Sequence, residues 1–243
     1  MSIERQAWAQ RPHGRPAGFQ RWRQLLFLHW NFDPSELAPT LPAGLQVDTF
    51  RGKAYVGVVP FTMRDVAPWW SPPVPGISHF HELNVRTYVL YRGQPGVWFY
   101  SLEAAATIAV VVARVGWGLP YHRASIQLKT HAEQLHYRSR RLWPGPRPAH
   151  FRADYSLGAA LGAAQPGTLE HFLVERYLLF TERKPGVLQR GQVHHRPYPL
   201  QDVTVHTYEE SMLAAAGLSR PEQVPIAHYS PGVDVDVYAL TGT

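Results

Sequence analysis

Short stretches in which hydrophobic and polar residues alternate run along most of the chain, and glycine and proline separate them. This rhythm is typical of a protein built mainly from β-strands. We expect an antiparallel sheet that is closed or half-closed, with a turn at residues 51–53 joining two neighbouring strands. The predicted strands cover residues 24–30, 45–50, 54–61, 79–91, 97–102, 125–131, 134–142, 149–156, 175–181 and 233–240.

Four segments have the pattern of helices. Residues 33–36 read Asp-Pro-Ser-Glu, which combines a capping residue, a proline suited to the first helical position and a glutamate placed for a capping box. Residues 103–115 are rich in alanine, lack an internal breaker and end before two glycines, so they predict the best helix of the chain. A short helix is expected to start at Thr168, and a last one to cover residues 208–216.

The organisation along the chain indicates one domain. Residues 1–18 contain regularly spaced prolines and glycines, so we expect a loose arm, followed by a single domain over residues 19–243. No secretory signal is visible, and the longest apolar run, residues 104–113, is shorter than the ~20 residues that span a bilayer. We therefore expect a cytoplasmic protein with no membrane partner. The absence of cysteine excludes disulfides, thiolate metal sites and a cysteine nucleophile.

The formal net charge of +6 comes from arginine, since 21 of the 24 basic residues are arginine and only three are lysine. A nucleic-acid-binding surface clusters its basic residues, whereas these are scattered. We interpret the densest group as the solvated face of a hairpin and expect no nucleic-acid partner. That group consists of Arg138, Arg140, Arg141, Arg147 and Arg152.

The long strand predicted over residues 79–91 carries the most informative pattern. Side chains two residues apart share one face of a strand, so Phe80, Glu82, Asn84, Arg86 and Tyr88 lie together. Such a face suits the polar wall of a lumen, and the alternative is an ordinary solvent-facing surface. Glu82 and Arg86 are separated by roughly 13 Å along the strand, so they would hold a ligand from two ends.

The segment after the alanine-rich helix is a second candidate. Tyr121 is a hydrogen-bond donor, His122 is an acid or base near neutral pH, and Arg123 is an anion clamp. The alternative is that these are ordinary surface residues.

Thirteen histidines raise the question of a metal site. His79 and His81 share one face of their strand and would ligate a metal if a third ligand came from elsewhere. They lie on the face opposite Glu82, however, and no two-histidine-plus-carboxylate spacing is present. We therefore expect no metal and no cofactor.

Nine stretches, in the same order, resemble the YqjF-like bacterial proteins of the acetoacetate decarboxylase-like superfamily from about residue 20 to 240. The resemblance implies an α+β fold, mainly antiparallel β, in which a curled sheet forms a cone-like barrel around a lumen with a few outer helices. The stretches are LQVDT (45–49), YVGVVPF (55–61), ELNVRTYV (82–89), PGVWF (95–99), AR (113–114), LPY (119–121), ERY (175–177), VHHRP (193–197) and YSPGVD (229–234).

The decarboxylases of that superfamily carry their catalytic lysine just after a helix, in a segment of proline-lysine-lysine type. Two adjacent amines lower the pKa of the reactive one and let it form a Schiff base. The matching stretch here, Pro-Tyr-His-Arg at 120–123, contains no amine, and Lys53, Lys129 and Lys184 are isolated. The resemblance therefore does not extend to Schiff-base decarboxylation, but it does match Glu82 to the lumen glutamate of the superfamily.

Together these patterns predict that the lumen binds a small polar or anionic molecule resembling a keto acid. If the protein is an enzyme, we expect lysine-independent acid–base chemistry on a carbonyl compound. One alternative is a non-enzymatic binding or structural module whose lumen is filled by its own side chains, and another is a histidine-ligated metalloprotein. The related decarboxylases form large oligomers, so the resemblance allows a homo-oligomer. The candidate catalytic residues are Glu82, His122 and Tyr121, and the candidate binding residues are Arg86, Asn84, Arg123, Trp69, Trp70 and Trp98.

Overall fold

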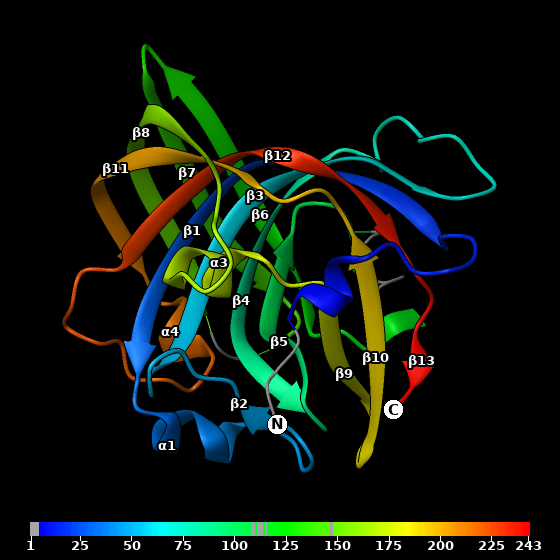
Figure 1. Cartoon of the computed structure of the whole chain (residues 1–243). Helices are drawn as coiled ribbons and strands as arrows, with labels where there is room; N and C mark the ends of the chain where they lie inside the picture. The colour runs from blue at the N-terminus through cyan, green and yellow to red at the C-terminus, as the bar shows by residue number, and fades with distance from the viewer. Residues whose placement is uncertain (1–4, 108–109, 111–113, 115, 146–147) are drawn as a thin grey trace.

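The computed structural model describes residues 5–107, 110, 114, 116–145 and 148–243, and the described part consists mainly of strands (Figure 1). The strands are β1 (Gly18–Phe32), β2 (Gln46–Val47), β3 (Ala54–Pro68), β4 (Phe80–Tyr91), β5 (Gln94–Ala104), β6 (Tyr121–His131), β7 (Gln134–Trp143), β8 (His150–Ala163), β9 (Leu178–Lys184), β10 (Val187–His194), β11 (Pro199–Glu210), β12 (Ile226–Val237) and β13 (Thr241–Gly242). The short helices are η1 (Gln6–Ala9), α1 (Pro34–Leu37), η2 (Ala38–Thr40), α3 (Leu169–Val174) and α4 (Met212–Ala215).

Within the described residues the strands form one 13-stranded sheet in the order β13-β10-β9-β5-β6-β7-β8-β11-β12-β1-β3-β4-β2. Additional pairings of β4 with β5 and of β10 with β12 curl the sheet back onto itself. Two closed rings result, and they share the wall made of β12, β1, β3, β4 and β5. The sheet is largely antiparallel, and β5 pairs in parallel with β6 and β9. The predicted class of fold is thereby confirmed.

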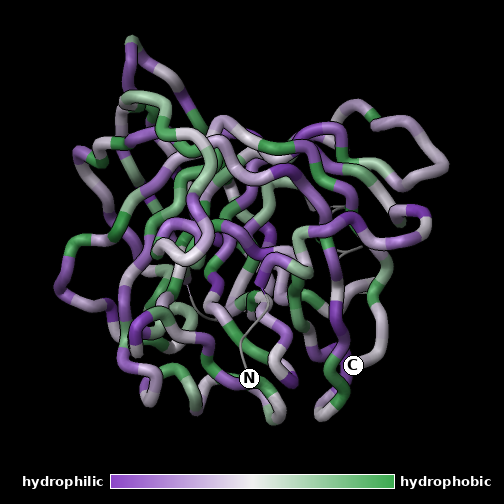
Figure 2. Tube along the Cα trace, viewed as in Figure 1, coloured by the Kyte–Doolittle hydropathy of each residue, from purple (hydrophilic) through white to green (hydrophobic). Residues whose placement is uncertain are grey.

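The shared wall explains the long hydrophobic runs of β1 and β3. Both of its faces are buried, so alternate residues enter two different cores. Leu28 and Val58 pack in the core beside β6, β7 and β8, whereas Phe27 and Val59 pack in the core beside α3. Figure 2 shows hydrophobic positions recurring along these central strands, with hydrophilic ones between them.

Several local predictions are confirmed. Asp33 accepts a hydrogen bond from the backbone N–H of Ser35, and Glu36 completes the capping box of α1. The side chain of Thr168 caps α3. Of the strands predicted between residues 24 and 156, only 45–50 is largely absent, since β2 covers just two of its residues; the others are present, and most of them are longer than the hydrophobic pattern alone indicated.

Other local predictions are wrong. Residues 45–50 do not form a hairpin with β3, because β2 pairs with β4 instead. Residues 208–216 are divided between the end of β11 and α4, since Tyr208 pairs with Ala153 of β8. Strand β10 was not predicted.

The predicted helix at residues 103–115 starts too early. Glu103 and Ala104 belong to β5, where backbone pairing with β4 outweighs the helical preference of an alanine-rich segment. Most of the remainder of that segment lies outside the described residues.

The described part of the predicted N-terminal arm contacts the domain. Arg5 donates two hydrogen bonds to the carboxylate of Asp48, which is 1 % exposed. The arm then enters β1 at Gly18, opposite Pro68 of β3. None of the described helices has the length and hydrophobicity needed to cross a membrane.

Candidate functional site

A cavity of about 590 Å³ lies inside the ring that contains β9 and β10, and it is lined by residues of the shared wall and of β6, β9 and β10. Most of its lining is apolar. The polar side chains on its wall include Glu82, Asn84, Arg86, Tyr121, Arg176 and Tyr198. The lumen is therefore not filled by the chain's own side chains, contrary to one alternative expectation.

Strand β4 supplies one wall of this cavity through its alternation. Glu82, Asn84 and Arg86 face the cavity, whereas Leu83 and Val85 pack in the other core. All three polar side chains are at least 92 % buried, at 2 %, 5 % and 8 % exposure. The face predicted from the sequence is confirmed, and it is an interior face rather than a solvent-facing one.

Glu82 and Tyr121 form a hydrogen-bonded pair on the cavity wall. The Tyr121 hydroxyl donates to Glu82 Oε2 at 3.0 Å, and the backbone carbonyl of Glu82 accepts from the Tyr137 hydroxyl at 2.8 Å. Burial raises the pKa of the Glu82 carboxyl to about 8; the Tyr121 hydrogen bond lowers it, and the charge of Glu103 raises it. Glu82 is consequently protonated at neutral pH and offers the cavity a carboxylic O–H.

Arg86 is a buried cation on the same wall. Its Nη2 donates to the backbone carbonyl of Leu173 at 3.3 Å, and its guanidinium lies 5.6 Å from the Phe27 ring centroid and 5.7 Å from that of Tyr88. None of the ion pairs among the described residues includes it. Among the described residues, neither its Nε nor the Oδ1 of Asn84 has a hydrogen-bond partner. A buried guanidinium without a carboxylate partner keeps hydrogen-bond donors that an anion can satisfy.

Arg176 strengthens the positive charge at this end of the cavity. It forms an ion pair of 3.0 Å with Asp48 and stacks over Phe172 at 4.3 Å. Asp48 is shared with Arg5, so one carboxylate serves two guanidinium groups. Burial lowers the pKa of Arg176 to about 10. This value is still well above neutral pH, so the guanidinium is cationic at neutral pH. Sequence reasoning missed Arg176 as a site residue; its only signal was the family-like stretch at residues 175–177.

His29, which sequence reasoning also missed, is linked to Arg86 through Tyr88 and the backbone carbonyl of Leu173. Tyr88 donates its hydroxyl proton to the carbonyl of Leu173 at 2.6 Å and therefore accepts from Nε2 of His29 at 2.7 Å. Burial lowers the pKa of His29 well below its usual value, so the ring is neutral with its proton on Nε2. The Leu173 carbonyl accepts hydrogen bonds from both the Tyr88 hydroxyl and Nη2 of Arg86, so these hydrogen bonds together orient the guanidinium.

Four predicted site residues lie away from the cavity. His122 points to the opposite face of β6 from Tyr121, and its Nδ1 is 2.7 Å from the backbone carbonyl of Pro144. Burial lowers the pKa of His122 to about 4. Arg123 donates from Nε to Thr107 at 3.0 Å, and Trp98 packs in a separate hydrophobic cluster.

Trp69 is the fourth predicted site residue outside the cavity lining, whereas its neighbour Trp70 is a lining residue. Trp69 is 48 % exposed and lies under the guanidinium of Arg15 at 4.1 Å, outside the cavity lining. Trp70 is 70 % exposed and does line the cavity, at its open end.

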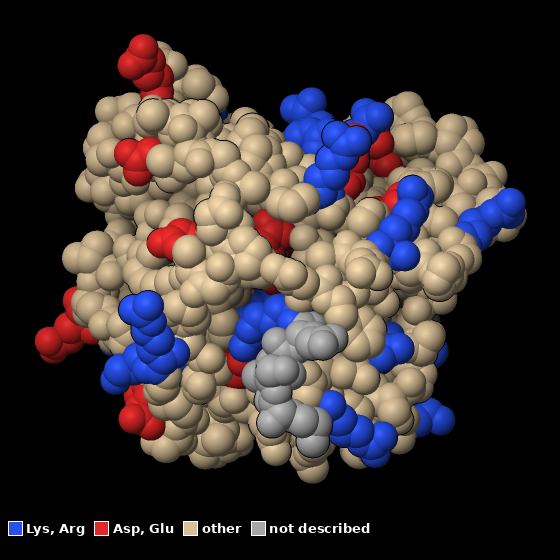
Figure 3. All heavy atoms as spheres, in the orientation of Figure 1, with Lys and Arg blue, Asp and Glu red and all other residues tan. Residues whose placement is uncertain are grey.

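The positions of the basic side chains decide whether an amine is available in the cavity. Lys53, Lys129 and Lys184 are all exposed, and none of them lines the cavity. Arg141 is not a surface residue, because it is buried in an ion pair with Glu103. Several of the basic side chains at the top of Figure 3 lie beside acidic ones.

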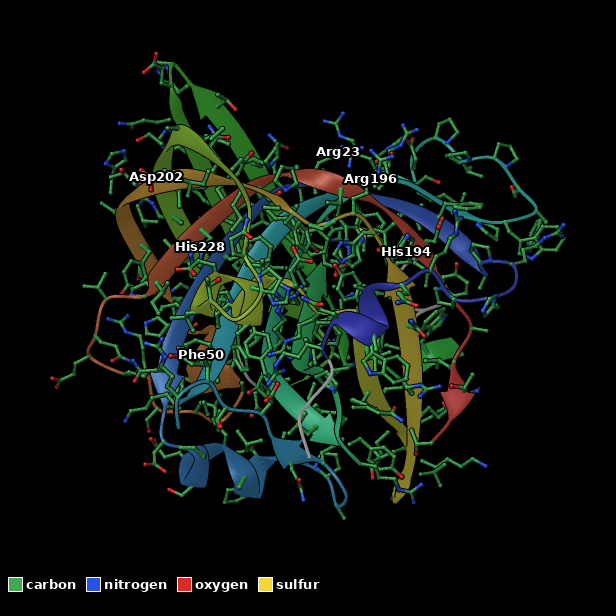
Figure 4. The ribbon with its side chains drawn as sticks, in the orientation of Figure 1. Arg23, Phe50, His194, Arg196, Asp202 and His228 are labelled. Atoms are coloured by element: carbon green, nitrogen blue, oxygen red, sulfur yellow. The ribbon has the colours of Figure 1, made fainter. Side chains whose placement is uncertain are left out.

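The histidines are distributed over the molecule. His81 hydrogen-bonds Thr62 at 3.0 Å, and His79 is 3.6 Å from Asp65. His194 on β10 and His228 on β12 lie on different sides of the molecule (Figure 4). In the part of the chain that the structure describes, no three histidine, aspartate or glutamate side chains are grouped to hold a metal ion.

The fold belongs to the class seen in acetoacetate decarboxylase-like enzymes. The structure matches the enduracididine biosynthesis enzyme MppR complexed with pyruvate with a TM-score of 0.65, at 13 % identity over 96 % of this chain and 93 % of that one. It matches the acetoacetate decarboxylase of Legionella pneumophila with a TM-score of 0.63, at 16 % identity over 98 % and 94 % of the two chains. At this level of identity the likeness establishes the fold alone.

The sequence itself defines the family. Residues 19–234 match the family model DUF2071, described as "Uncharacterized conserved protein (COG2071)". The chain is also 35 % identical over 221 residues to "Uncharacterized protein YqjF" of Bacillus subtilis, covering 91 % of this chain and 90 % of that protein. The chain is thus a member of the DUF2071 family, as the sequence resemblance indicated.

Proposed function

We propose that this protein binds a small organic anion that carries a carbonyl group, such as a 2-oxo acid, in its central cavity and without forming a Schiff base. The observation that carries the proposal is Arg86, a guanidinium buried on the cavity wall that forms no ion pair with any acidic residue the structure describes. A carboxylate can satisfy it through two parallel charge-assisted hydrogen bonds. Arg176 adds positive potential at the same end, because Asp48 is shared between two arginines.

Glu82 supplies the second half of the recognition. Its protonated carboxyl donates to a carbonyl oxygen of the bound anion, while Tyr121 holds the carboxyl in place. A carboxyl with a pKa near 8 also exchanges a proton readily at neutral pH, so general acid–base chemistry on the carbonyl compound is the second candidate function.

The structural relatives are consistent with this class of ligand. MppR has been solved in complex with pyruvate, and the Legionella protein is an acetoacetate decarboxylase. A Schiff base requires an amine in the cavity, and all three lysines of this chain are exposed and are not among the lining residues. We therefore propose recognition by hydrogen bonds and ion pairing alone.

Calorimetric titration with pyruvate and 2-oxobutanoate tests the proposal. We expect binding by the wild-type protein and a loss of affinity of roughly tenfold to a hundredfold in Arg86→Gln, since a hydrogen bond to a charged group contributes about 1.5–3 kcal/mol. Arg123→Gln is the matched control, because Arg123 lies outside the cavity lining, and its affinity should stay unchanged. Binding that survives in Arg86→Gln, or absence of binding to the wild type, would overturn the proposal. After the titrations, borohydride reduction should leave no covalent adduct; an adduct would contradict the exclusion of a Schiff base.

A further inference from the structure

The strand register gives the cavity a long axis. On the β3–β4 ladder, Arg86 lies opposite Gly57, Glu82 opposite Phe61 and Phe80 opposite Met63. Beyond Met63, β3 continues along β1 to Pro68, which lies opposite Gly18. All of these residues except Gly57 line the cavity. The six residue steps from Arg86 to Phe80 alone span roughly 20 Å at the usual rise of a strand.

The chemistry of the wall changes along this axis. The end at Arg86 is charged, and both Arg86 and Arg176 are buried there. The stretch beyond Glu82 is apolar, with Phe80, Met63, Val66 and Ala67 on the wall. Gln20, which also lines this stretch, already accepts a hydrogen bond from Trp22 at 2.8 Å.

The apolar end of the axis is the open one. Phe19 is 43 % exposed and Trp70 is 70 % exposed, although both line the cavity. Trp70 lies in the β3–β4 connection, which projects from the upper right of the molecule in Figure 1. A ligand anchored at Arg86 therefore extends past Glu82 toward these two aromatic side chains.

The size of the cavity does not suit a three-carbon acid. A volume of about 590 Å³ falls in the range of sites that enclose drug-sized ligands. Pyruvate at Arg86 would leave the apolar stretch in contact with water, and covering that stretch contributes binding free energy in proportion to the area removed from water.

From this arrangement we infer that the physiological ligand is an elongated amphipathic acid, whose carboxylate binds Arg86 and whose hydrocarbon chain lies along the apolar wall toward Trp70. The inference rests on the proposed function, because it takes the anion site at Arg86 as given. It adds the class of molecule, which is a medium-chain aliphatic acid rather than a short keto acid.

The test is a chain-length series measured by calorimetry on the full-length protein. The probes are 2-oxobutanoate, 2-oxohexanoate, 2-oxooctanoate and 2-oxodecanoate, each used below its micelle concentration. Burial of one methylene contributes about 0.8 kcal/mol, so the affinity should rise about fourfold for each methylene. Arg86→Gln should weaken all four acids by a similar factor.

Phe61 and Phe50 provide a matched pair of variants. Phe61 lines the cavity opposite Glu82, roughly 13 Å from Arg86 along the strand, so a ten-carbon chain can reach its ring and a four-carbon acid cannot. Phe61→Leu should therefore weaken 2-oxodecanoate several-fold and leave 2-oxobutanoate unchanged. Phe50→Leu makes the same exchange outside the cavity lining, and it should change neither affinity. Both exchanges keep a large apolar side chain, so neither variant is expected to prevent folding.

The outcomes separate the inference from the proposed function. If the four acids bind with equal affinity, or if affinity falls with length, the inference is overturned while the anion site stands. The inference also fails, and the anion site again stands, if Phe50→Leu and Phe61→Leu weaken the long acid equally. If none of the acids binds, the proposed function fails and the inference fails with it.

Discussion

The Tyr121 hydroxyl, at the start of β6, donates to Oε2 of Glu82 on β4 at 3.0 Å, although 39 positions separate the two residues in the chain. Strand β5 lies between them, since Leu102 pairs with Tyr121 while Ala104 pairs with Glu82. The contact exists only because β4, β5 and β6 are adjacent in the curled sheet. It holds a protonated carboxyl at the middle of the cavity.

Replacing Tyr121 with phenylalanine should raise the pKa of Glu82 above its value of about 8, because the lost hydrogen bond lowers that pKa in the native protein. The midpoint can be followed by carbon-13 NMR of labelled glutamate side chains. Tyr100→Phe is the control, since it removes a hydroxyl that bonds Thr40 instead. A midpoint that stays in place or moves down in Tyr121→Phe would contradict the assigned contact.

Glu82→Gln should stabilise the protein at high pH and have little effect at low pH. The folded pKa of Glu82, about 8, exceeds its ordinary value of 4.5, so below pH 4.5 both states are protonated and folding carries no ionisation penalty; stability is then lost as the pH rises from 4.5 to about 8, because the unfolded state ionises first. The difference in unfolding free energy between variant and wild type should grow over this window to a few kcal/mol, on the order expected for a shift of this size. Urea unfolding at a series of pH values measures it, and a difference independent of pH would refute the assignment.

The ion pair between Glu103 and Arg141 should behave as a buried pair. Glu103 is fully buried and the Arg141 side chain is 6 % exposed, so Arg141→Met should cost about 3–5 kcal/mol at pH 8, because the buried Glu103 loses the partner that favours its ionised form and must stay unpaired or take up a proton. The double variant Glu103→Gln, Arg141→Met should recover part of that loss. Arg152→Met, which breaks the more exposed pair with Asp154, should cost less than about 1 kcal/mol. Equal losses in the two single variants, measured by chemical denaturation, would contradict this ranking.

His122→Ala should leave the affinity for 2-oxo acids within about twofold of the wild type, as measured by calorimetry, because its side chain lies on the face of β6 opposite the cavity. Its lost hydrogen bond to the Pro144 carbonyl should lower the unfolding free energy by about 1 kcal/mol. A large loss of affinity without a loss of stability would mean that His122 reaches the ligand.

The successes and failures of the sequence-based predictions have physical reasons. Alternation along β4 placed Glu82, Asn84 and Arg86 on one face, because the period of two is a local property of any strand. The same rule separates Tyr121 from His122, since β6 begins at Tyr121 and neighbouring side chains on a strand point in opposite directions. The sequence pattern predicts this strand only from residue 125 onward, so it does not separate Tyr121 from His122.

Arg176 and His29 are residues near the cavity that local sequence patterns did not identify. Arg176 was not proposed as a site residue because its contribution depends on the ion pairs among Arg176, Asp48 and Arg5, and the last two lie far from it in the chain. His29 lies within a hydrophobic strand, and its role depends on Tyr88, 59 positions away. Trp69 and Trp70 are likewise indistinguishable by residue type, and only the path of the β3–β4 connection separates their environments.

The amino-acid sequence alone determined the strand-rich class, the capped ends of α1 and α3, and the shared face of β4, since these follow from turn chemistry and from the pleat of a strand. The tertiary structure decided that this face is interior, because only the closure of the sheet through β4–β5 and β10–β12 buries both sides of the shared wall. Closure also decided which charges have partners. Burial and pairing depend on residues brought together from distant parts of the chain, and local periodicity carries no information about them.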